Sequence, residues 1–198
     1  AKLKVKKQES APASLVVKSG DRNVINEAFR VIRTNLEFVT RNSDSKALMI
    51  TSFNPGSGKT FISINTAAVL AIRGKKVLLV DGDFRRASSS KFFNLSSHGF
   101  ADFLSAPAGK DIHDYIRKYE PVPNLSVLPI GTIPPNPSEL VSSQAFTDTI
   151  EVLKKEYDYL ILDCAPVDIV ADTQIIAPVA DRTVFVIRAG LFEKELLK

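Results

Sequence analysis

A loop of small residues, set between an apolar run and a helical pattern, contains the side chains best suited to chemistry. It reads NPGSGKT and ends at Lys59 and Thr60. Its two glycines let backbone N–H groups turn inward towards phosphate oxygens, and the following helix directs its positive end to the same place. Lys59 can reach the β- and γ-phosphates of a nucleoside triphosphate, and the Thr60 hydroxyl can ligate Mg²⁺. We therefore predict that ATP or ADP with Mg²⁺ is bound by Pro55, Gly56, Ser57, Gly58, Lys59, Thr60 and Phe61.

One position departs from the general phosphate-loop pattern. That pattern has a glycine five residues before the second glycine of the loop, where this sequence has Phe53. A simple glycine-rich turn at the start of a helix is therefore the alternative. We favour the phosphate loop because the Lys-Thr pair is in place and carboxylates follow other predicted strands.

Three aspartates follow short apolar runs that are typical of buried strands. Asp81 and Asp83 come after the run VLLV, and Asp163 comes after LIL. A carboxylate there can hold Mg²⁺ directly or through water, opposite Thr60, and a second can accept the proton of an attacking hydroxyl. A single aspartate is more often a turn or N-cap residue, but three beside a phosphate loop favour function. We predict Lys59, Asp81 and Asp83 as catalytic residues and Thr60, Asp81 and Asp163 as metal ligands, and leave open which of Asp81 and Asp83 is the base.

Other reactive side chains have simpler roles as alternatives. Arg85 and Arg86 follow the first pair of aspartates, and they either contact a phosphate or substrate anion or are solvated. Cys164, beside a predicted strand, is interpreted as a small packed thiol. His98 and His113 lack metal-ligand spacing and are interpreted as surface or loop residues.

The elements that must position these residues alternate between strands and helices. Several expected strands are continuously apolar, which indicates burial on both faces in a parallel sheet covered by helices. The expected class is therefore α/β: a doubly wound, mostly parallel sheet with helices on both faces, whose ligands bind at the carboxyl ends of the strands. The expected strands are 46–52, 76–81, 125–129, 159–163 and 182–188, and the expected helices are 24–39, 60–73, 100–104, 138–155 with Ser138 as N-cap, and 172–179.

Composition and charge narrow the class of protein. A chain of 198 residues with 44% hydrophobic and 24% charged residues suits one globular α/β domain, which we place at 21–198. Residues 1–20 contain lysine, serine and proline without a clear period, so we expect a basic, flexible arm. The net charge of +4 comes without an aromatic-interleaved basic stripe, so we expect no nucleic-acid partner. The single cysteine excludes an intrachain disulfide and fits a reducing compartment.

The two ends of the sequence indicate a part of a longer protein. The chain starts without Met and stops within a polar helical pattern at 192–198. It has no recognisable signal peptide and no apolar run long enough to span a membrane. We therefore expect the chain itself to be soluble.

Five segments together resemble the cytoplasmic kinase domain of the bacterial tyrosine kinases of capsule and exopolysaccharide export. Those similar to the Walker A, A′ and B motifs of that family are TSFNPGSGKT at 51–60, VLLVDGDFRR at 77–86 and YDYLILDCAPV at 157–167. Two further segments are similar to family motifs, namely EAFRVIRTNL at 27–36 and GTIPPNPSEL at 131–140. The resemblance covers nearly everything from residue 21 to the end.

The resemblance implies a function, partners and a fold like that of the P-loop NTPase MinD. The implied activity is ATP-dependent phosphorylation of tyrosines on neighbouring subunits, which regulates polysaccharide polymerisation and export at the cytoplasmic face of the bacterial inner membrane. The implied partners are further copies of the chain in a ring, a fused or separate membrane adaptor that activates the kinase, and tyrosine-containing protein substrates. The implied intersubunit contacts are Glu27, Arg30 and Arg33, for which i, i+3 charge pairing on a solvated face is the alternative.

The sequence differs from the family pattern at two places, and two alternative functions remain open. The tyrosine cluster that ends the family's kinases is missing, and one proline, not two, follows Asp163. One rival is a MinD- or ParA-like switch ATPase, and the other is a non-catalytic nucleotide-dependent assembly module. The switch ATPases have a signature lysine where this chain has Asn54, so the loop favours the kinase.

Overall fold

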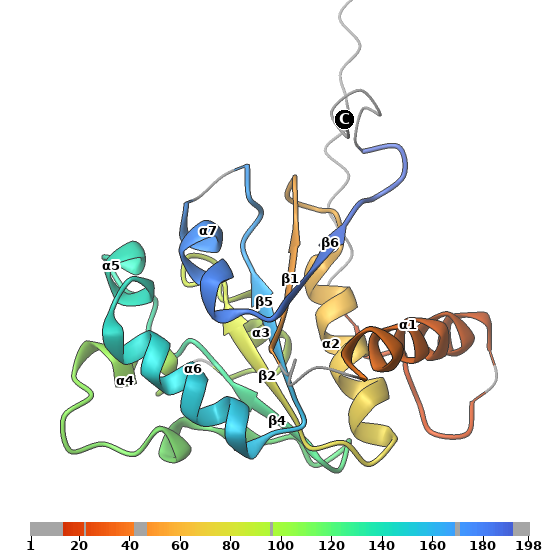
Figure 1. Ribbon diagram of the computed structural model, residues 1–198, viewed down its shortest axis with the longest axis horizontal. Coiled ribbons are helices and arrows are strands. Elements are labelled where there is room, and N and C mark those ends of the chain that lie inside the picture. The colour runs from red at the N-terminus through yellow and green to blue at the C-terminus, as the bar shows by residue number, and fades with distance from the viewer. Residues whose placement is uncertain (1–13, 22, 42–46, 96, 169–170, 192–198) are drawn as a thin grey trace, which may run out of the picture.

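A parallel sheet forms the centre of the computed structural model, which describes residues 14–21, 23–41, 47–95, 97–168 and 171–191. In this described part the sheet has six strands in the order β3-β4-β2-β5-β1-β6, and every neighbouring pair is parallel except β3 with β4 (Figure 1). The predicted doubly wound, mostly parallel sheet is confirmed. The strands are β1 (Ala47–Ser52), β2 (Val77–Gly82), β3 (Arg117–Lys118), β4 (Leu125–Leu128), β5 (Tyr159–Cys164) and β6 (Arg182–Val186).

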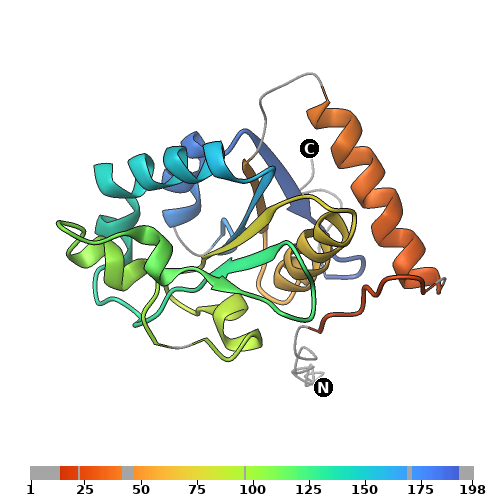
Figure 2. The same ribbon diagram turned by 90° about the horizontal axis from the view of Figure 1, so that it is seen from below.

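Helices cover both faces of the sheet (Figure 2). Leu48 and Leu79 pack with α2 on one face, whereas Met49 and Val80 pack with α4, α6 and α7 on the other. Because both faces bury apolar side chains, the strands show no polar alternation. No helix of the described residues is long and apolar enough to cross a membrane. The helices are α1 (Val24–Thr40), α2 (Lys59–Ile72), α3 (Ser88–Phe92), α4 (Phe100–Ser105), α5 (Pro137–Val141), α6 (Gln144–Glu156) and α7 (Asp172–Ile176), with 3-10 turns at Ile112–Tyr115 and Ala177–Val179.

The single helix predicted at 138–155 is wrong, because the structure divides it into α5 and α6. The Ser143 side chain accepts a hydrogen bond from a backbone N–H of the next turn and caps α6 as a new helix. The N-cap of α5 is Asn136, not Ser138. The Ser138 hydroxyl instead donates to Asp172 (2.6 Å). The short elements α3 and β3 were not predicted, because neither is long enough to show a period.

Residues 14–18, within the expected arm, pack against α1 and α2. Val17 is 4% exposed. The side-chain oxygen of Asn65 in α2 accepts hydrogen bonds from the backbone N–H groups of Val16 and Val17 (2.8 and 3.1 Å). This stretch is therefore held against the domain, whereas 1–13 and the pattern at 192–198 lie outside the described residues.

Candidate active site

The phosphate loop joins the end of β1 to the first turn of α2, at the carboxyl edge of the sheet (Figure 1). Gly56 and Gly58 have φ values of 79° and 92°, in the left-handed region that favours glycine. Ser57 Oγ braces the loop by donating to the carbonyl oxygen of Asn54 (2.8 Å). Helix α2 begins at Lys59, so the positive end of a 14-residue helix faces the loop. This arrangement suits a bound phosphate.

Lys59 reaches from the loop to the residue that follows β2. Its Nζ lies 3.5 Å from Asp83 Oδ2, and both side chains are largely buried. Asp83 Oδ1 accepts a hydrogen bond from the backbone N–H of Arg86 (3.1 Å), whereas Asp83 Oδ2 has no hydrogen-bond partner among the described residues. A buried carboxylate oxygen without a hydrogen bond is costly, so the charge of Lys59 is the main compensation for it. Two of the three predicted catalytic residues, Lys59 and Asp83, are therefore brought together.

Asp81 and Asp163 lie directly opposite each other on the adjacent strands β2 and β5. Both side chains are fully buried. Burial, followed by the charge of Asp163, raises the pKa of Asp81 to about 7, although hydrogen bonds from Ser90 act in the other direction. The charge of Asp163 therefore disfavours the ionised state of Asp81, and a bound cation would favour it again.

These residues fit a magnesium ion. Thr60, Asp81 and Asp163 offer only oxygen atoms, which Mg²⁺ prefers, and the opposed carboxylates call for a positive charge. The described part of the chain contains no ready-made group of three or more His, Cys, Asp or Glu side chains that could hold a metal. Such a cage is not required, because Mg²⁺ is commonly held by one or two carboxylates while water and nucleotide phosphates supply the other ligands.

Arg85 forms an ion pair with a buried carboxylate. Its Nε donates to Asp172 Oδ2 (2.7 Å), and its Nη2 donates to Ser138 Oγ (3.1 Å). Since Asp172 is 2% exposed, Arg85 links the loop after β2 to α5 and α7. The Arg86 side chain is exposed. Contact of either arginine with a phosphate or a substrate anion stays a prediction.

The three residues predicted to join subunits lie on α1, with different exposure. Glu27 and Arg30 form an ion pair on the solvent side. Arg33 turns towards Glu37, with 3.8 Å between Nε and Oε1, and its side chain is only 20% exposed. Arg33 Nε is buried and has no hydrogen-bond partner among the described residues. A second copy of the chain could therefore reach Glu27 and Arg30 more easily than Arg33.

The outward face of α1 carries an apolar stripe. Val24, Val31 and Phe38 are spaced seven residues apart and are 85%, 59% and 77% exposed. Residues at this spacing lie on one stripe of a helix. We call these three residues the α1 stripe.

Comparisons with known proteins agree with this geometry. A family model described as an AAA domain matches residues 45–195. The tyrosine-protein kinase YwqD of Bacillus subtilis (strain 168) is 37% identical over 183 residues, which are 92% of this chain and 76% of YwqD. The chain therefore belongs to the bacterial tyrosine kinases, within the AAA-domain family.

Longer and solved members of the kinase family show the same likeness. The tyrosine-protein kinase Etk of Escherichia coli (strain K12) is 36% identical over 166 residues, which are 83% of this chain and only 22% of Etk. The crystal structure of the chimerical protein CapA2B2 has a TM-score of 0.85 and 36% identity, and the match covers 93% of this chain and 80% of that one. The predicted family and the predicted kinase fold are confirmed.

The cell-division ATPase family shares the fold more distantly. MinD of Pyrococcus horikoshii OT3, solved with Mg-ADP, has a TM-score of 0.61 and 25% identity, covering 72% of this chain and 57% of that one. The tyrosine kinases are therefore more similar to this chain than MinD is, in both sequence and structure.

Several polar residues of this site were not predicted from the sequence. Ser63 Oγ donates to Asp163 Oδ1 (3.0 Å), and Ser89 Oγ donates to Asp163 Oδ2 (2.5 Å). Arg188 Nη1 donates to the carbonyl oxygen of Gly56 in the phosphate loop (3.1 Å). The three consecutive serines at 88–90, directly after the second motif, are a signal that could have found Ser89. Ser63 and Arg188 have no comparable signal.

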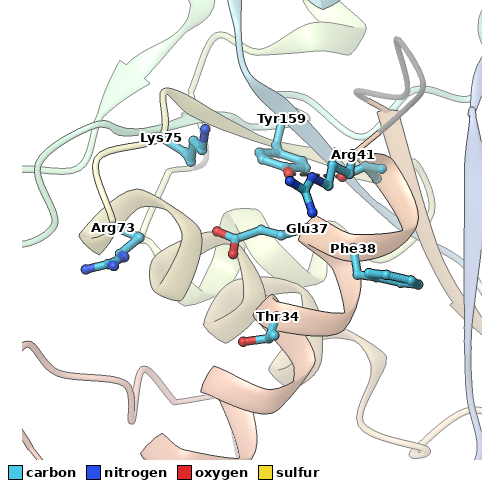
Figure 3. A pocket seen from close by; sticks show the side chains of 8 residues that line it. Thr34, Glu37, Phe38, Arg41, Arg73, Lys75 and Tyr159 are labelled. Atoms are coloured by element: carbon cyan, nitrogen blue, oxygen red, sulfur yellow. Dashed lines mark hydrogen bonds between the residues drawn. The ribbon is translucent and has the colours of Figure 1, made fainter.

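A hollow of about 740 Å³ lies at the other end of the kinase sheet (Figure 3). Tyr159 lies at its base, where its hydroxyl is 3.1 Å from Thr40 Oγ1. The hollow is also lined by Arg41 and Arg73, the C-cap residues of α1 and α2, and by Lys75, which follows α2. These cations face the negative ends of two helices, which explains their presence without a ligand. None of the predicted site residues lines this hollow.

Proposed function

We propose that this chain transfers the γ-phosphoryl group of ATP to tyrosine hydroxyls, first of all on neighbouring copies of the kinase. The observation that carries the proposal is the meeting of Lys59 with Asp83, beside the opposed Asp81 and Asp163. A cation and three carboxylates at the start of one helix and the ends of two strands suit a triphosphate with Mg²⁺. The family membership given above adds tyrosine as the acceptor.

Each residue has a role in this proposal. The loop amides from Gly56 to Thr60 and the Lys59 ammonium stabilise negative charge on the transferring group. The Thr60 hydroxyl, Asp81 and Asp163 would hold Mg²⁺, which supplies charge neutralisation to the phosphates. Because Lys59 leaves Asp83 when it turns to phosphate, Asp83 is the residue whose partner changes on nucleotide binding. Arg85 and Arg86 would contact a phosphate or a substrate anion.

Proton transfer completes the reaction. The tyrosine oxygen forms a bond to the γ-phosphorus as the bond to the ADP oxygen breaks, and the tyrosine proton passes to a carboxylate. The candidates for this base are Asp81, which lies opposite Asp163, and Asp83, which faces Lys59.

The proposed function also includes partners of the kinase, namely further copies of the chain and a membrane adaptor. Glu27 and Arg30 on α1 support self-association, and a ring is the expected form. A membrane adaptor, fused or separate, would activate the kinase at the cytoplasmic face of the bacterial inner membrane. The small share of Etk that the chain covers, 22%, leaves room in such a relative for a further part. The output would be control of capsule or exopolysaccharide polymerisation and export.

The decisive experiment offers the chain a tyrosine-rich peptide with labelled ATP and Mg²⁺. Phosphotyrosine on the peptide, absent from a parallel reaction with Lys59→Met, supports the kinase. Release of free phosphate without phosphotyrosine, in the presence of a membrane-adaptor segment, supports the switch ATPase instead. The switch ATPase is the second candidate function because the structure resembles that of MinD, with a TM-score of 0.61.

A further inference from the structure

The one-turn helix α3 follows the loop after β2 and carries two buried hydroxyls. Ser89 and Ser90 are 0% and 2% exposed. Serines in a first helical turn commonly bond to the helix backbone. Here the hydroxyls turn away from their own helix and reach carboxylates on the sheet. Ser89 Oγ donates to Asp163 Oδ2, and Ser90 Oγ donates to Asp81 Oδ2.

Ser90 supplies two donors to a single carboxylate oxygen. Its backbone N–H and its Oγ donate to Asp81 Oδ2, at 2.8 and 2.7 Å. Its Oγ also accepts a hydrogen bond from the backbone N–H of Ile130 (2.9 Å). Ser90 therefore joins Asp81 to the residue that precedes the proline-rich loop at 131–137, and its hydroxyl has both a donor and an acceptor partner. Such a fully used hydroxyl fixes the orientation of the carboxylate it touches.

Ser89 holds the opposite carboxylate in the same way. Asp163 lies between two hydroxyls: Ser89 Oγ donates to Oδ2, and Ser63 Oγ from α2 shares its one proton between Oδ1 and the carbonyl oxygen of Lys59. Each carboxylate oxygen has two lone pairs, so these bonds leave one on each oxygen for a metal-bound water or another donor. Hydrogen bonds to both of its oxygens hold the Asp163 side chain in one rotamer before a ligand binds.

We propose that Ser89 and Ser90 are positioning residues of the phosphoryl-transfer site, which orient Asp163 and Asp81 for Mg²⁺ and nucleotide. The inference rests on the proposed function. Partners that orient the ligands of a metal commonly change its affinity by about 10–100-fold when they are removed. The same helix turn provides a matched control, because Ser88 is half-buried and its hydroxyl has no carboxylate partner among the described residues.

The test compares Ser89→Ala, Ser90→Ala and the control Ser88→Ala in the full chain. A fluorescent ADP analogue reports nucleotide binding, first in EDTA and then during titration with Mg²⁺, and thermal unfolding without metal reports stability. We expect Ser89→Ala and Ser90→Ala to weaken Mg²⁺ about 10-fold or more, with binding in EDTA unchanged. Ser88→Ala should match the parent throughout.

Two results would overturn the proposal. One is an unchanged Mg²⁺ midpoint in both variants. The other is an equal loss of Mg²⁺ binding and of binding in EDTA, which would mark a general structural defect. If Ser90→Ala does not fold, Ser90→Cys replaces it, because Cys has a similar shape and is a weaker hydrogen-bond donor. The Mg²⁺ midpoint of Ser90→Cys should lie between those of the parent and Ser89→Ala. A midpoint equal to that of the parent would contradict the proposal. Since Mg²⁺ binding is read without phosphoryl transfer, a parent that binds Mg-ADP but makes no phosphotyrosine refutes only the proposed function.

Discussion

The carboxyl edge of the sheet and the outward face of α1 differ in which side chains they bury and which they expose. At the sheet edge, Asp81, Asp83 and Asp163 are at most 1% exposed, and each accepts hydrogen bonds from the kinase itself. On α1, by contrast, Val24 and Phe38 are 85% and 77% exposed. One region buries charges, and the other exposes apolar groups.

Each of the two regions lacks a different partner. The buried carboxylates need a cation, which Lys59 supplies in part and a metal would complete. The α1 stripe needs an apolar surface, which a second molecule would supply. Changes at the sheet edge should therefore alter stability and chemistry together, whereas changes on α1 should alter association alone.

The largest effect is expected from Lys59→Met. The variant removes the cation that faces both the phosphates and Asp83, so phosphoryl transfer should fall about 10²–10³-fold or more. The buried Asp83 also loses its partner, so the free energy of unfolding should fall by about 1–3 kcal/mol. Transfer to a tyrosine peptide and chemical unfolding measure the two effects.

A double variant separates these effects. Lys59→Met with Asp83→Asn removes the unpaired charge, so it should recover stability without recovering transfer. Transfer at the parent rate by Lys59→Met would refute the assignment of the loop lysine.

Asp81→Asn should change how stability depends on pH. The folded pKa of Asp81 is about 7 and its usual value is 3.8, so the folded state holds a proton that the unfolded state has lost between these limits. The parent therefore loses stability as pH rises from about 4 to 7. Relative to Asp81→Asn, the loss should be on the order of 3–4 kcal/mol.

Unfolding in urea at pH 4.5 and at pH 8, without metal, measures this difference. Parallel curves for the two proteins would contradict the raised pKa. Added Mg²⁺ with ADP should restore part of the stability of the parent at pH 8, because a bound cation favours the ionised carboxylate.

The sequence predicted the scaffold of the site better than its polar contacts. The strands were readable because burial on both faces makes each an uninterrupted apolar run, as in VLLV before Asp81. The break between α5 and α6 was not, because serine is neither a strong helix breaker nor confined to caps. Ser89 meets Asp163 across 74 residues, and no local pattern reports such a contact. The half-buried Arg33 likewise depends on how α1 packs on α2, which helical spacing alone does not give.

A smaller effect is expected from Arg30→Ala with Arg33→Ala, which tests the polar part of α1. The exposed Glu27–Arg30 pair should contribute at most about 1 kcal/mol to folding. We expect the variant to reduce the size of an oligomeric parent in sedimentation or gel filtration. Glu151→Ala is the control, because the Glu151 side chain is 53% exposed and forms an i, i+3 ion pair with Lys154 on α6. An oligomer that is unchanged by the double variant would exclude these arginines from the interface.

The smallest effect on folding is expected from the α1 stripe itself. Because Val31 and Phe38 remain 59% and 77% exposed in the folded chain, replacing each by serine should change the free energy of unfolding by no more than about 0.5 kcal/mol. Association should weaken nonetheless, since an apolar stripe gains stability only when a second surface covers it. Val152→Ser on α6 provides the control, because Val152 is 45% exposed on another helix. Equal changes in association for all three variants would mean that the stripe has no special part in assembly, whereas a large loss of stability in Phe38→Ser would mean that this side chain already packs within its own chain.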